Sequence, residues 1–402
     1  MTAMLETLSP LPADPILGTT VACRNDPNPL KVDLGVGVYK DDDGRTPVFA
    51  AVTEAERRII ASQDTKAYVS PPGDQRFISG IIRELFGSDH PAVADGRVGA
   101  VQAPGGSGAL RLGAGLLLRA KAGTRMWLST PTWGNHVPLM GAAGLTLKKY
   151  PYYDFDTHSI DIDGMLAELA TLGPGDVALL HGCCHNPSGA DLTVEQWDAV
   201  GDLAEERGFT PYVDIAYHGL GEGMEADTYG VRMLARRVPE MLISYSASKN
   251  FGLYRERTGL ALSVSADAHG ASTATSQMAN IARELYSMPP AHGASIVAEI
   301  LDDTELSASW TAEVGMMRDR INGLRALLSE RLREATDSAQ FDFIAGERGM
   351  FSFLGFTPEQ VRDLQTLHSV YPIPSSRINV AGITEANVDY VAAAVAAIAR
   401  EA

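Results

Sequence analysis

The sequence has 402 residues, a formal net charge of −17, and 45% apolar and 21% charged residues. This composition is typical of globular proteins rather than disordered or fibrous ones, and the length allows two or three domains. The acidic excess argues against a nucleic-acid partner, because binding to a phosphate backbone depends on clustered Lys and Arg.

The first ten residues contain no basic segment followed by an apolar one, so we predict no secretion signal. The apolar stretch 391–399 is far shorter than the roughly 20 residues needed to cross a bilayer. Cys23, Cys183 and Cys184 are too few and too badly spaced for a disulfide framework. We therefore expect a cytoplasmic protein without a membrane partner.

A glycine-rich segment, Pro104-Gly-Gly-Ser-Gly-Ala-Leu-Arg111, precedes an apolar helical run that ends near Ala120. Glycines that open a helix expose backbone N–H groups, which together with the helix dipole can bind a phosphate. The segment matches neither a dinucleotide-binding motif nor a Walker A motif. Alone, it favours a plain loop and helix start over a phosphate site.

Residues 176–181 form a short apolar run that is typical of a buried parallel strand, and residues 211–214 predict the next strand. Between them, Thr193 and Gln196 have the spacing of a capping box, and Gly208 closes the helix that they open. A strand, a helix and a strand at this spacing indicate a βαβ crossover and hence an α/β fold.

Residues 241–244 predict a further strand of the same sheet. In open parallel sheets the ligand binds beyond the carboxyl ends of the strands. His181, Asp214 and Ser246 lie at or just past such ends, so we expect them to lie near a ligand.

From about Leu301 onward, long helical segments replace this pattern, including 312–334. Strand-like pieces follow around 341–353 and 377–380. No Gly/Ser-rich or Pro-rich linker interrupts the chain. We therefore expect a second, smaller α+β domain that shares a broad interface with the first.

The segment His181-Gly-Cys-Cys-His185 contains residue types that bind zinc. Adjacent cysteines cannot easily both point at one tetrahedral ion, and no second cysteine pair completes a site. We therefore expect buried thiols and hydrogen-bonded histidines here, and no metal.

Lys249 ends the hydroxyl-rich segment Ser244-Tyr-Ser-Ala-Ser-Lys249, and Arg257 follows closely. By itself Lys249 suits a solvated surface position, and Asp214, at the end of an apolar strand, suits a structural carboxylate with satisfied hydrogen bonds. Together these residues supply an amine for a Schiff base, an anion site and a partner for a pyridinium nitrogen. These are the requirements of a pyridoxal phosphate site.

A series of segments runs in order along nearly the whole chain: Ala13-Asp-Pro-Ile-Leu-Gly18, Leu34-Gly-Val-Gly-Val-Tyr-Lys40, Gly105-Gly-Ser-Gly108, Trp133-Gly-Asn-His136, His185-Asn-Pro-Ser-Gly189, Asp214-Ile-Ala-Tyr217, Ser246-Ala-Ser-Lys-Asn-Phe-Gly252, Arg257 and Ser376-Arg-Ile-Asn-Val380. The series resembles the aspartate aminotransferase family, the class I aminotransferases of fold type I that use pyridoxal phosphate. The resemblance implies an N-terminal arm over 1–12 and a small α+β domain formed by 13–45 with 312–402. It also implies a large cofactor-binding domain over 46–311, with a mainly parallel, seven-stranded type of sheet flanked by helices.

Carried over position by position, the resemblance makes Lys249 the lysine that bonds to the cofactor and then moves a proton between the substrate Cα and the cofactor C4′. Asp214, supported by His136 and His181, keeps the pyridine nitrogen protonated, and Tyr217 completes the catalytic set. The implied cofactor contacts are Asn186 and Tyr217 at the phenolate oxygen, Trp133 stacked on the ring, and a phosphate cup of Gly106, Ser107, Ser246, Ser248 and Arg257, with Tyr68 from the other subunit.

Arg377 resembles the arginine that grips the substrate α-carboxylate, a task that suits a guanidinium fork better than an ammonium group. Gly37 lines that end of the site, and Trp133 and Asn186 also belong to the substrate site. Arg283 matches the neighbouring subunit's arginine for the distal carboxylate of dicarboxylic substrates. The resemblance therefore implies a homodimer with shared active sites, and amino acids and 2-oxo acids as its small-molecule partners.

Several residues depart from the pattern of aspartate-specific members: Met288 and Ala67 replace polar Asn residues, Leu285 is apolar, and Ser107 replaces a Thr. An apolar wall of this kind accepts an aromatic ring once Arg283 swings away, as in the aromatic aminotransferases of the family. Other positions keep the aspartate-type pattern, namely Val38, Lys40 and Thr46.

We therefore predict an aminotransferase that exchanges an amino group between aromatic amino acids, aspartate or both and 2-oxoglutarate by a ping-pong mechanism. One alternative is a strictly aspartate-specific aminotransferase. Another is a fold type I decarboxylase or lyase, against which the two carboxylate anchors Arg283 and Arg377 argue. The third is a non-catalytic sensor that binds pyridoxal phosphate, for which the chain has neither the spare length nor the basic charge of a DNA-binding module.

Overall fold

The computed structural model describes residues 4–11 and 15–400. The ends of the expected N-terminal arm, and Ala13 and Asp14 of the first family motif, lie outside the described residues. The chain divides into two compact units, of which the smaller takes Met1–Gly44, Leu324–Ala345 and Met350–Ala402, and the larger takes Arg45–Gly323 and Gly346–Gly349. The domain ranges expected from the sequence stay a prediction.

The larger unit is built on a seven-stranded sheet with the strand order β2-β10-β9-β8-β7-β3-β4. The strands are β2 (Val98–Pro104), β3 (Arg125–Thr130), β4 (Thr146–Pro151), β7 (Asp176–His181), β8 (Thr210–Ile215), β9 (Met241–Ser246) and β10 (Thr258–Val264). All pairs are parallel except those of β10, which runs antiparallel to β2 and β9. The predicted α/β class with a mainly parallel seven-stranded sheet is therefore confirmed.

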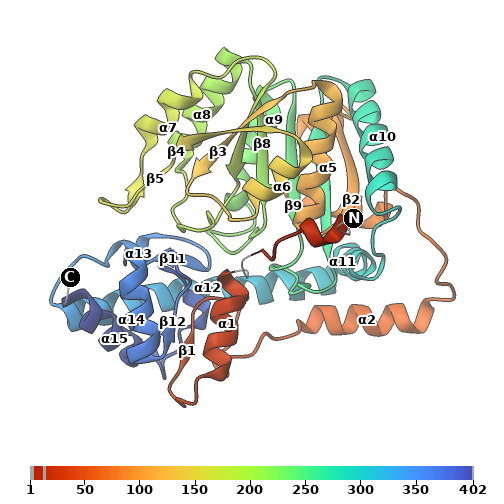
Figure 1. Cartoon of the computed structure of the whole chain (residues 1–402). Coiled ribbons are helices and arrows are strands. Elements are labelled where there is room, and N and C mark those ends of the chain that lie inside the picture. The colour runs from red at the N-terminus through yellow and green to blue at the C-terminus, as the bar shows by residue number, and fades with distance from the viewer. Residues whose placement is uncertain (1–3, 12–14, 401–402) are drawn as a thin grey trace. The chain divides into compact units, whose positions relative to one another are not determined.

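Helices surround this sheet, as Figure 1 shows. The larger unit contains α2 (Ala50–Ser62), α3 (Gln75–Phe86), α4 (Pro91–Ala94), α5 (Gly105–Ala120), α6 (His136–Ala143), α7 (Ile162–Leu169), α8 (Val194–Arg207), η2 (Ala226–Thr228), α9 (Tyr229–Arg237), α10 (Ala268–Leu285), α11 (His292–Asp302) and the beginning of α12 (Thr304–Thr336), with a small hairpin of β5 (Tyr153–Asp154) and β6 (Ser159–Ile160). Among these, α2 packs on α11 rather than on the sheet. Helix α5 packs on β9 and β10, and α10 packs on α5 and β2. Buried side chains such as Leu110, Leu112 and Met278 fill these contacts, so the start of α5 is held against the sheet.

Local sequence signals explain why the βαβ unit forms where the sequence predicted it. Thr193 accepts a hydrogen bond from the backbone N–H of Gln196, and the two residues complete the expected capping box at the start of α8. Gly208 ends α8 with φ +72°, a left-handed conformation that glycine adopts without steric strain. The strand before this helix has the predicted bounds 176–181.

The smaller unit contains two short two-stranded sheets and several helices. Its elements are η1 (Met4–Thr7), α1 (Pro15–Asn25), β1 (Val32–Asp33), α13 (Phe343–Gly346), β11 (Phe351–Phe353), α14 (Pro358–His368), β12 (Val370–Tyr371), β13 (Arg377–Asn379), η3 (Val380–Gly382), α15 (Val388–Arg400) and the end of α12 (Thr304–Thr336). The sequence prediction of strand-like structure over 341–353 was wrong for its first part, because residues 343–346 form the short helix α13. Ile344 is fully buried on that helix, so its apolar character reflects packing rather than strand alternation.

No helix in the described part of the chain is long and apolar enough to cross a membrane.

Candidate active site

The carboxyl ends of three neighbouring strands meet at one edge of the large sheet. His181 pairs in register with Asp214, and Asp214 pairs with Ser244. Ser246 is the last residue of β9. The sheet therefore gathers the polar residues that the sequence placed at strand ends, as expected for the ligand side of a parallel sheet.

Lys249 lies in the turn after β9 and is only partly exposed. Its Nζ lies 4.7 Å from the centre of the Tyr217 ring. Burial lowers the pKa of Lys249 to about 8, with a further lowering from the charge of Arg257 and an opposing effect from Asp214. The alternative of a solvated surface lysine is therefore wrong, and the amine loses its proton far more readily than an ordinary lysine.

Asp214 is a buried carboxylate with two side-chain partners. Ser244 donates to its Oδ1 at 2.5 Å, and His136 Nε2 lies 3.3 Å from its Oδ2. Burial raises the pKa of Asp214, but the hydrogen bonds and charge from His136, with the Ser244 hydroxyl, outweigh burial and hold the pKa below its usual range. The site therefore contains a buried anion at neutral pH.

A chain of hydrogen bonds continues from Asp214 through His136. The Nδ1 atom of His136 lies 2.8 Å from the Thr132 hydroxyl, which lies 3.2 Å from His181 Nε2. Burial, together with the neighbouring His136, lowers the pKa of His181 to about 3, so this imidazole is neutral. Nothing in the sequence singles out Thr132 except its position four residues before His136.

His185 occupies the loop that follows β7. Its two ring nitrogens lie 2.7 Å from the Ser188 hydroxyl and 3.2 Å from the Ser129 hydroxyl. Its ring stacks on Tyr152 at 4.1 Å between centroids, and Cys183 and Cys184 beside it are buried thiols. The hydroxyl partners account for both nitrogens, which agrees with the expectation of hydrogen-bonded histidines.

Asn186 and Tyr217 face each other across the same edge, with the Asn186 amide 3.4 Å from the Tyr217 hydroxyl. Both are buried, and the Asn186-Pro187 peptide bond is cis. Trp133 packs edge-on against His136 at 5.2 Å between ring centroids. The structure therefore brings the side chains expected to contact a cofactor ring to the neighbourhood of Asp214.

The N-terminus of α5 forms a cradle with the end of β9. The hydroxyls of Ser246 and Ser248 lie 3.0 Å apart, and Arg257 Nη1 lies 3.5 Å from the latter. A Cβ atom on Gly105 would lie 2.4 Å from Arg257 Nη2, and one on Gly106 would lie 3.2 Å from the Ser246 Cβ. Glycines are therefore needed here, because larger residues would fill the space beside the guanidinium and hydroxyl groups.

Arg257 itself is held in a left-handed conformation with φ +53°. Its Nη1 donates to the Tyr254 carbonyl at 2.9 Å. A Cβ atom on Gly259 would lie 2.4 Å from the backbone carbonyl carbon of Gly105, so only glycine at 259 lets the strand approach Gly105 this closely. A strained arginine, two hydroxyls and the N–H groups of a helix start form an anion site of the size and chemistry of a phosphate.

A family model described as Aminotransferase class I and II matches residues 29–395. The chain belongs to the class I and II aminotransferases. It is 44% identical over 388 residues to the aromatic-amino-acid aminotransferase of Pseudomonas aeruginosa, covering 96% of this chain and 97% of that protein. It is 43% identical over 395 residues to the aspartate aminotransferase of Salmonella typhi, covering 98% of this chain and 100% of that protein.

A solved structure extends this similarity of the aminotransferase to three dimensions. The aromatic-amino-acid aminotransferase of Burkholderia pseudomallei, covalently bound to pyridoxal phosphate, matches with a TM-score of 0.96 at 40% identity. The match covers 99% of this chain and 100% of that one. The fold is therefore that of the family throughout.

Two residues that the family resemblance assigns to a partner subunit's site are exposed in this aminotransferase. Tyr68 is 91% exposed. Arg283, at the end of α10, is exposed and donates to the Ser287 hydroxyl. Among the described residues Arg283 forms no ion pair, although the chain has a large acidic excess. Its guanidinium is therefore available to a carboxylate from elsewhere.

The remaining predicted substrate residues, Arg377 and Gly37, belong to the smaller unit. Arg377 is buried, its guanidinium carbon lies 4.1 Å from the Phe351 ring centre, and its Nη2 donates to the Gly35 carbonyl at 2.9 Å. A Cβ on Gly37 would lie 2.9 Å from the Phe351 Cζ. The contact with Phe351, which was not predicted from the sequence, is a cation–π interaction that helps to hold the guanidinium group.

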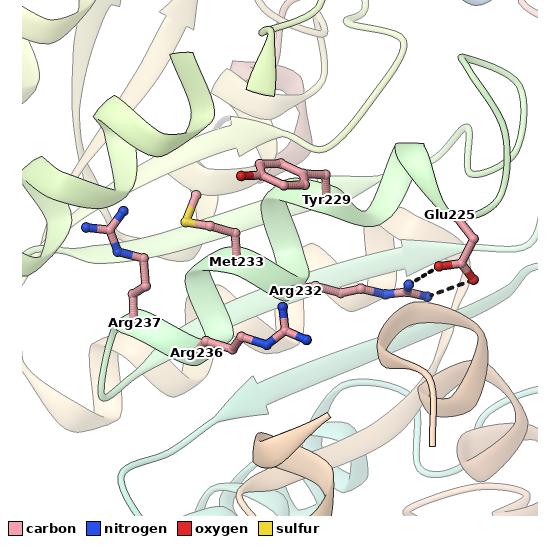
Figure 2. A pocket seen from close by; sticks show the side chains of 6 residues that line it. All are labelled: Glu225, Tyr229, Arg232, Met233, Arg236 and Arg237. Carbon is pink, nitrogen blue, oxygen red and sulfur yellow. Dashed lines mark hydrogen bonds and ion pairs between the residues drawn. The ribbon is translucent and has the colours of Figure 1, made fainter. Parts of the chain in front are cut away.

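A cavity of about 440 Å³ lies along α9 of the aminotransferase. Figure 2 shows its lining, Glu225, Tyr229, Arg232, Met233, Arg236 and Arg237. Arg232 pairs with Glu225, and Arg237 pairs with Asp202 and Glu205. Two of its three guanidinium groups thus already have acidic partners.

Proposed function

We propose that this protein is a pyridoxal phosphate-dependent aminotransferase that passes an amino group between an amino acid and a 2-oxo acid. The observation that carries the proposal is Lys249, a partly buried amine of lowered pKa whose charge interacts with the buried anion Asp214 and with Arg257 of the anion cradle. The aminotransferases of Pseudomonas aeruginosa and Salmonella typhi, similar over nearly their whole length, support the same activity.

The donor set of this site fits pyridoxal phosphate. Gly106, Ser107, Ser246, Ser248 and Arg257 would hold the phosphate, because helix N–H groups, hydroxyls and a guanidinium all donate to phosphate oxygens. Asp214 would pair with the ring nitrogen, Asn186 and Tyr217 would donate to the ring oxygen, and Trp133 would cover the ring. When bound, pyridoxal phosphate supplies a ring that accepts the electron pair left at the substrate Cα after a proton leaves.

Lys249 provides both the covalent anchor and the base. Once displaced by the substrate, its amine would take the proton from the substrate Cα and give it to the C4′ carbon of the cofactor. A base works best when its pKa lies near the working pH, and a pKa of about 8 is well placed for this task. Hydrogen bonds from Ser244 and His136 stabilise the anionic form of Asp214, which keeps its pKa below the usual range.

The substrate assignment rests on three groups. Arg377 would bind the α-carboxylate beside Gly37, and the unpaired guanidinium of Arg283 would bind the distal carboxylate of aspartate or glutamate. Leu285 is 45% exposed and Met288 follows it, which adds apolar surface suited to an aromatic ring. We therefore assign a broad range, aromatic amino acids and aspartate with 2-oxoglutarate. Strict aspartate specificity is the alternative favoured by Lys40 and Thr46.

The proposal includes a cytoplasmic homodimer in which Tyr68 and Arg283 enter the partner's site. Support for the dimer comes from the exposure of both side chains and from the lack of any hydrogen bond that joins them to Lys249 within the described chain. Support for the location comes from three free cysteines, which suit a reducing compartment.

Two measurements test this proposal. Steady-state kcat/KM for aspartate, phenylalanine and tyrosine with 2-oxoglutarate should show turnover of all three amino acids, and undetectable turnover of both aromatic ones would reject the broad range. Hybrid dimers of Lys249→Ala and Arg283→Ala subunits test the shared site. If Arg283 acts across the interface, one site of each hybrid is intact and aspartate activity returns on mixing. Activity that stays at the level of the separate variants would contradict sharing.

A further inference from the structure

Hydrogen bonds fix the turn that carries Lys249 both on its N-terminal side and at its end. The Ala247 N–H donates to the Thr258 carbonyl at 3.1 Å, and the Ser248 N–H lies 3.3 Å from the Ser246 hydroxyl. The Gly252 N–H closes the turn by donating to the Lys249 carbonyl at 3.0 Å. The peptide group that follows Asn250 needs a partner of its own, because this segment is buried.

Trp310 provides that partner from α12. Its indole Nε1 donates to the Asn250 carbonyl at 2.6 Å. Its ring stacks on Phe251 at 4.3 Å between centroids with planes 8° apart. Trp310, Asn250 and Phe251 all have 0% exposure, so water cannot replace either contact. One side chain therefore fixes two successive residues immediately after Lys249.

The side chain of Asn250 is held separately. Its amide lies 2.8 Å from the hydroxyl of Tyr245, a buried residue of β9. Asn250 is thus tied to the sheet by its side chain and to α12 by its carbonyl. These two contacts restrict the backbone at Asn250 and thereby the direction in which the preceding Lys249 leaves the turn.

We propose that Trp310 is a positioning residue for the reaction, because its N–H and ring hold the turn that aims the Lys249 amine at the reacting carbon. The inference rests on the proposed function, in which Lys249 is that amine. Loss of the N–H leaves the Asn250 carbonyl buried without a donor, and the peptide group then turns toward another partner. A displacement of about 1 Å in a reacting group costs roughly 100-fold in rate.

The test compares Trp310→Phe with Trp127→Phe. Phenylalanine at 310 keeps an aromatic ring against Phe251 and removes the N–H. Trp127, on β3, is a matched control, since it is also buried and its Nε1 donates at 2.8 Å, to Glu168, away from Lys249. Measurements are kcat per bound cofactor, KM, thermal midpoint, and the pH midpoint of Lys249 acylation in cofactor-free protein, followed by mass spectrometry of the peptide.

We expect Trp310→Phe to lower kcat about tenfold or more while KM changes little, as a displaced reacting group predicts. The acylation midpoint should move up from about 8 toward the ordinary lysine value as the amine becomes better solvated. Trp127→Phe should lose comparable thermal stability but keep the wild-type kcat and the wild-type acylation midpoint of Lys249. Equal kcat and equal acylation midpoints in the two variants would overturn the inference.

A second variant covers the case in which Trp310→Phe does not fold. Benzothienylalanine at 310 keeps the two-ring shape and replaces the N–H by sulfur, and the same changes in kcat and acylation midpoint are expected. Failure of the proposed function has a different signature, namely wild-type protein that does not transaminate. The acylation midpoint still decides the role of Trp310 in that case, because it needs no bound cofactor.

Discussion

Gly105→Ala perturbs the proposed phosphate cradle at a single atom. Gly105 has φ +71°, and an added Cβ would lie 2.4 Å from Arg257 Nη2 and 2.8 Å from Arg257 Cζ. The guanidinium is the far end of a flexible side chain, so it moves aside at little cost in stability. By moving, it leaves the position from which it would donate to phosphate.

The magnitude follows from two separate effects. A non-glycine residue in the left-handed region costs about 1–2 kcal/mol in folding free energy. A hydrogen bond to a charged group contributes about 1.5–3 kcal/mol, which corresponds to roughly 10- to 100-fold in the dissociation constant. Gly123→Ala separates the backbone strain from the loss of the phosphate contact, because Gly123 has φ +74° and its added Cβ would have nothing within 4 Å. Both variants should lose similar stability, and only Gly105→Ala should lose cofactor affinity.

The assay is absorbance titration of cofactor-free protein with pyridoxal phosphate, alongside urea unfolding of each variant. We expect wild-type affinity for Gly123→Ala and a dissociation constant roughly 10- to 100-fold higher for Gly105→Ala. Wild-type affinity in Gly105→Ala, or equal weakening in both variants, would refute the placement of the phosphate beside Arg257.

Three further predictions concern the ring, the amine and the substrate wall. Asp214→Asn removes the buried anion and should lower kcat about 100-fold or more; a loss below threefold would count against its role. The pKa of Lys249 falls from 10.5 to about 8 on folding, so the unfolded chain binds more protons between these pH values. The unfolding free energy of cofactor-free wild type, relative to Lys249→Met, should therefore rise from pH 8 toward pH 10.5 in urea titrations, and parallel pH profiles would contradict this. Met288→Asn should lower kcat/KM for phenylalanine about tenfold more than for aspartate, and a proportional loss for both would exclude Met288 from the aromatic wall.

Local patterns in the sequence were enough to predict the elements that carry the site. The strand 176–181 and the helix start at Thr193 depend on short-range periodicity and capping, and the structure has them at the predicted residues. The carboxyl ends of neighbouring parallel strands share one sheet edge, so the sequence alone was enough to predict that His181 and Asp214 lie together.

Other features depend on contacts between distant residues and leave no local signal. Trp310 meets Asn250 across 60 residues of chain, and nothing in the α12 sequence distinguishes that tryptophan from an ordinary core residue. Residues 343–346 were predicted as part of a strand because a short apolar run has no clear period. They form a short helix in which Ile344 is fully buried.

The most direct test of the proposed function is amino-group exchange by Lys249→Ala reconstituted with pyridoxal phosphate. Aspartate and phenylalanine, each with 2-oxoglutarate, would be assayed at saturating concentrations, with bound cofactor quantified in every sample. Wild type should exchange amino groups with both substrates, while Lys249→Ala should bind the cofactor without covalent attachment and lose at least 1,000-fold in kcat, as expected for removal of a combined base and nucleophile. Normal exchange rates in Lys249→Ala would contradict the assignment of Lys249 as the reacting amine.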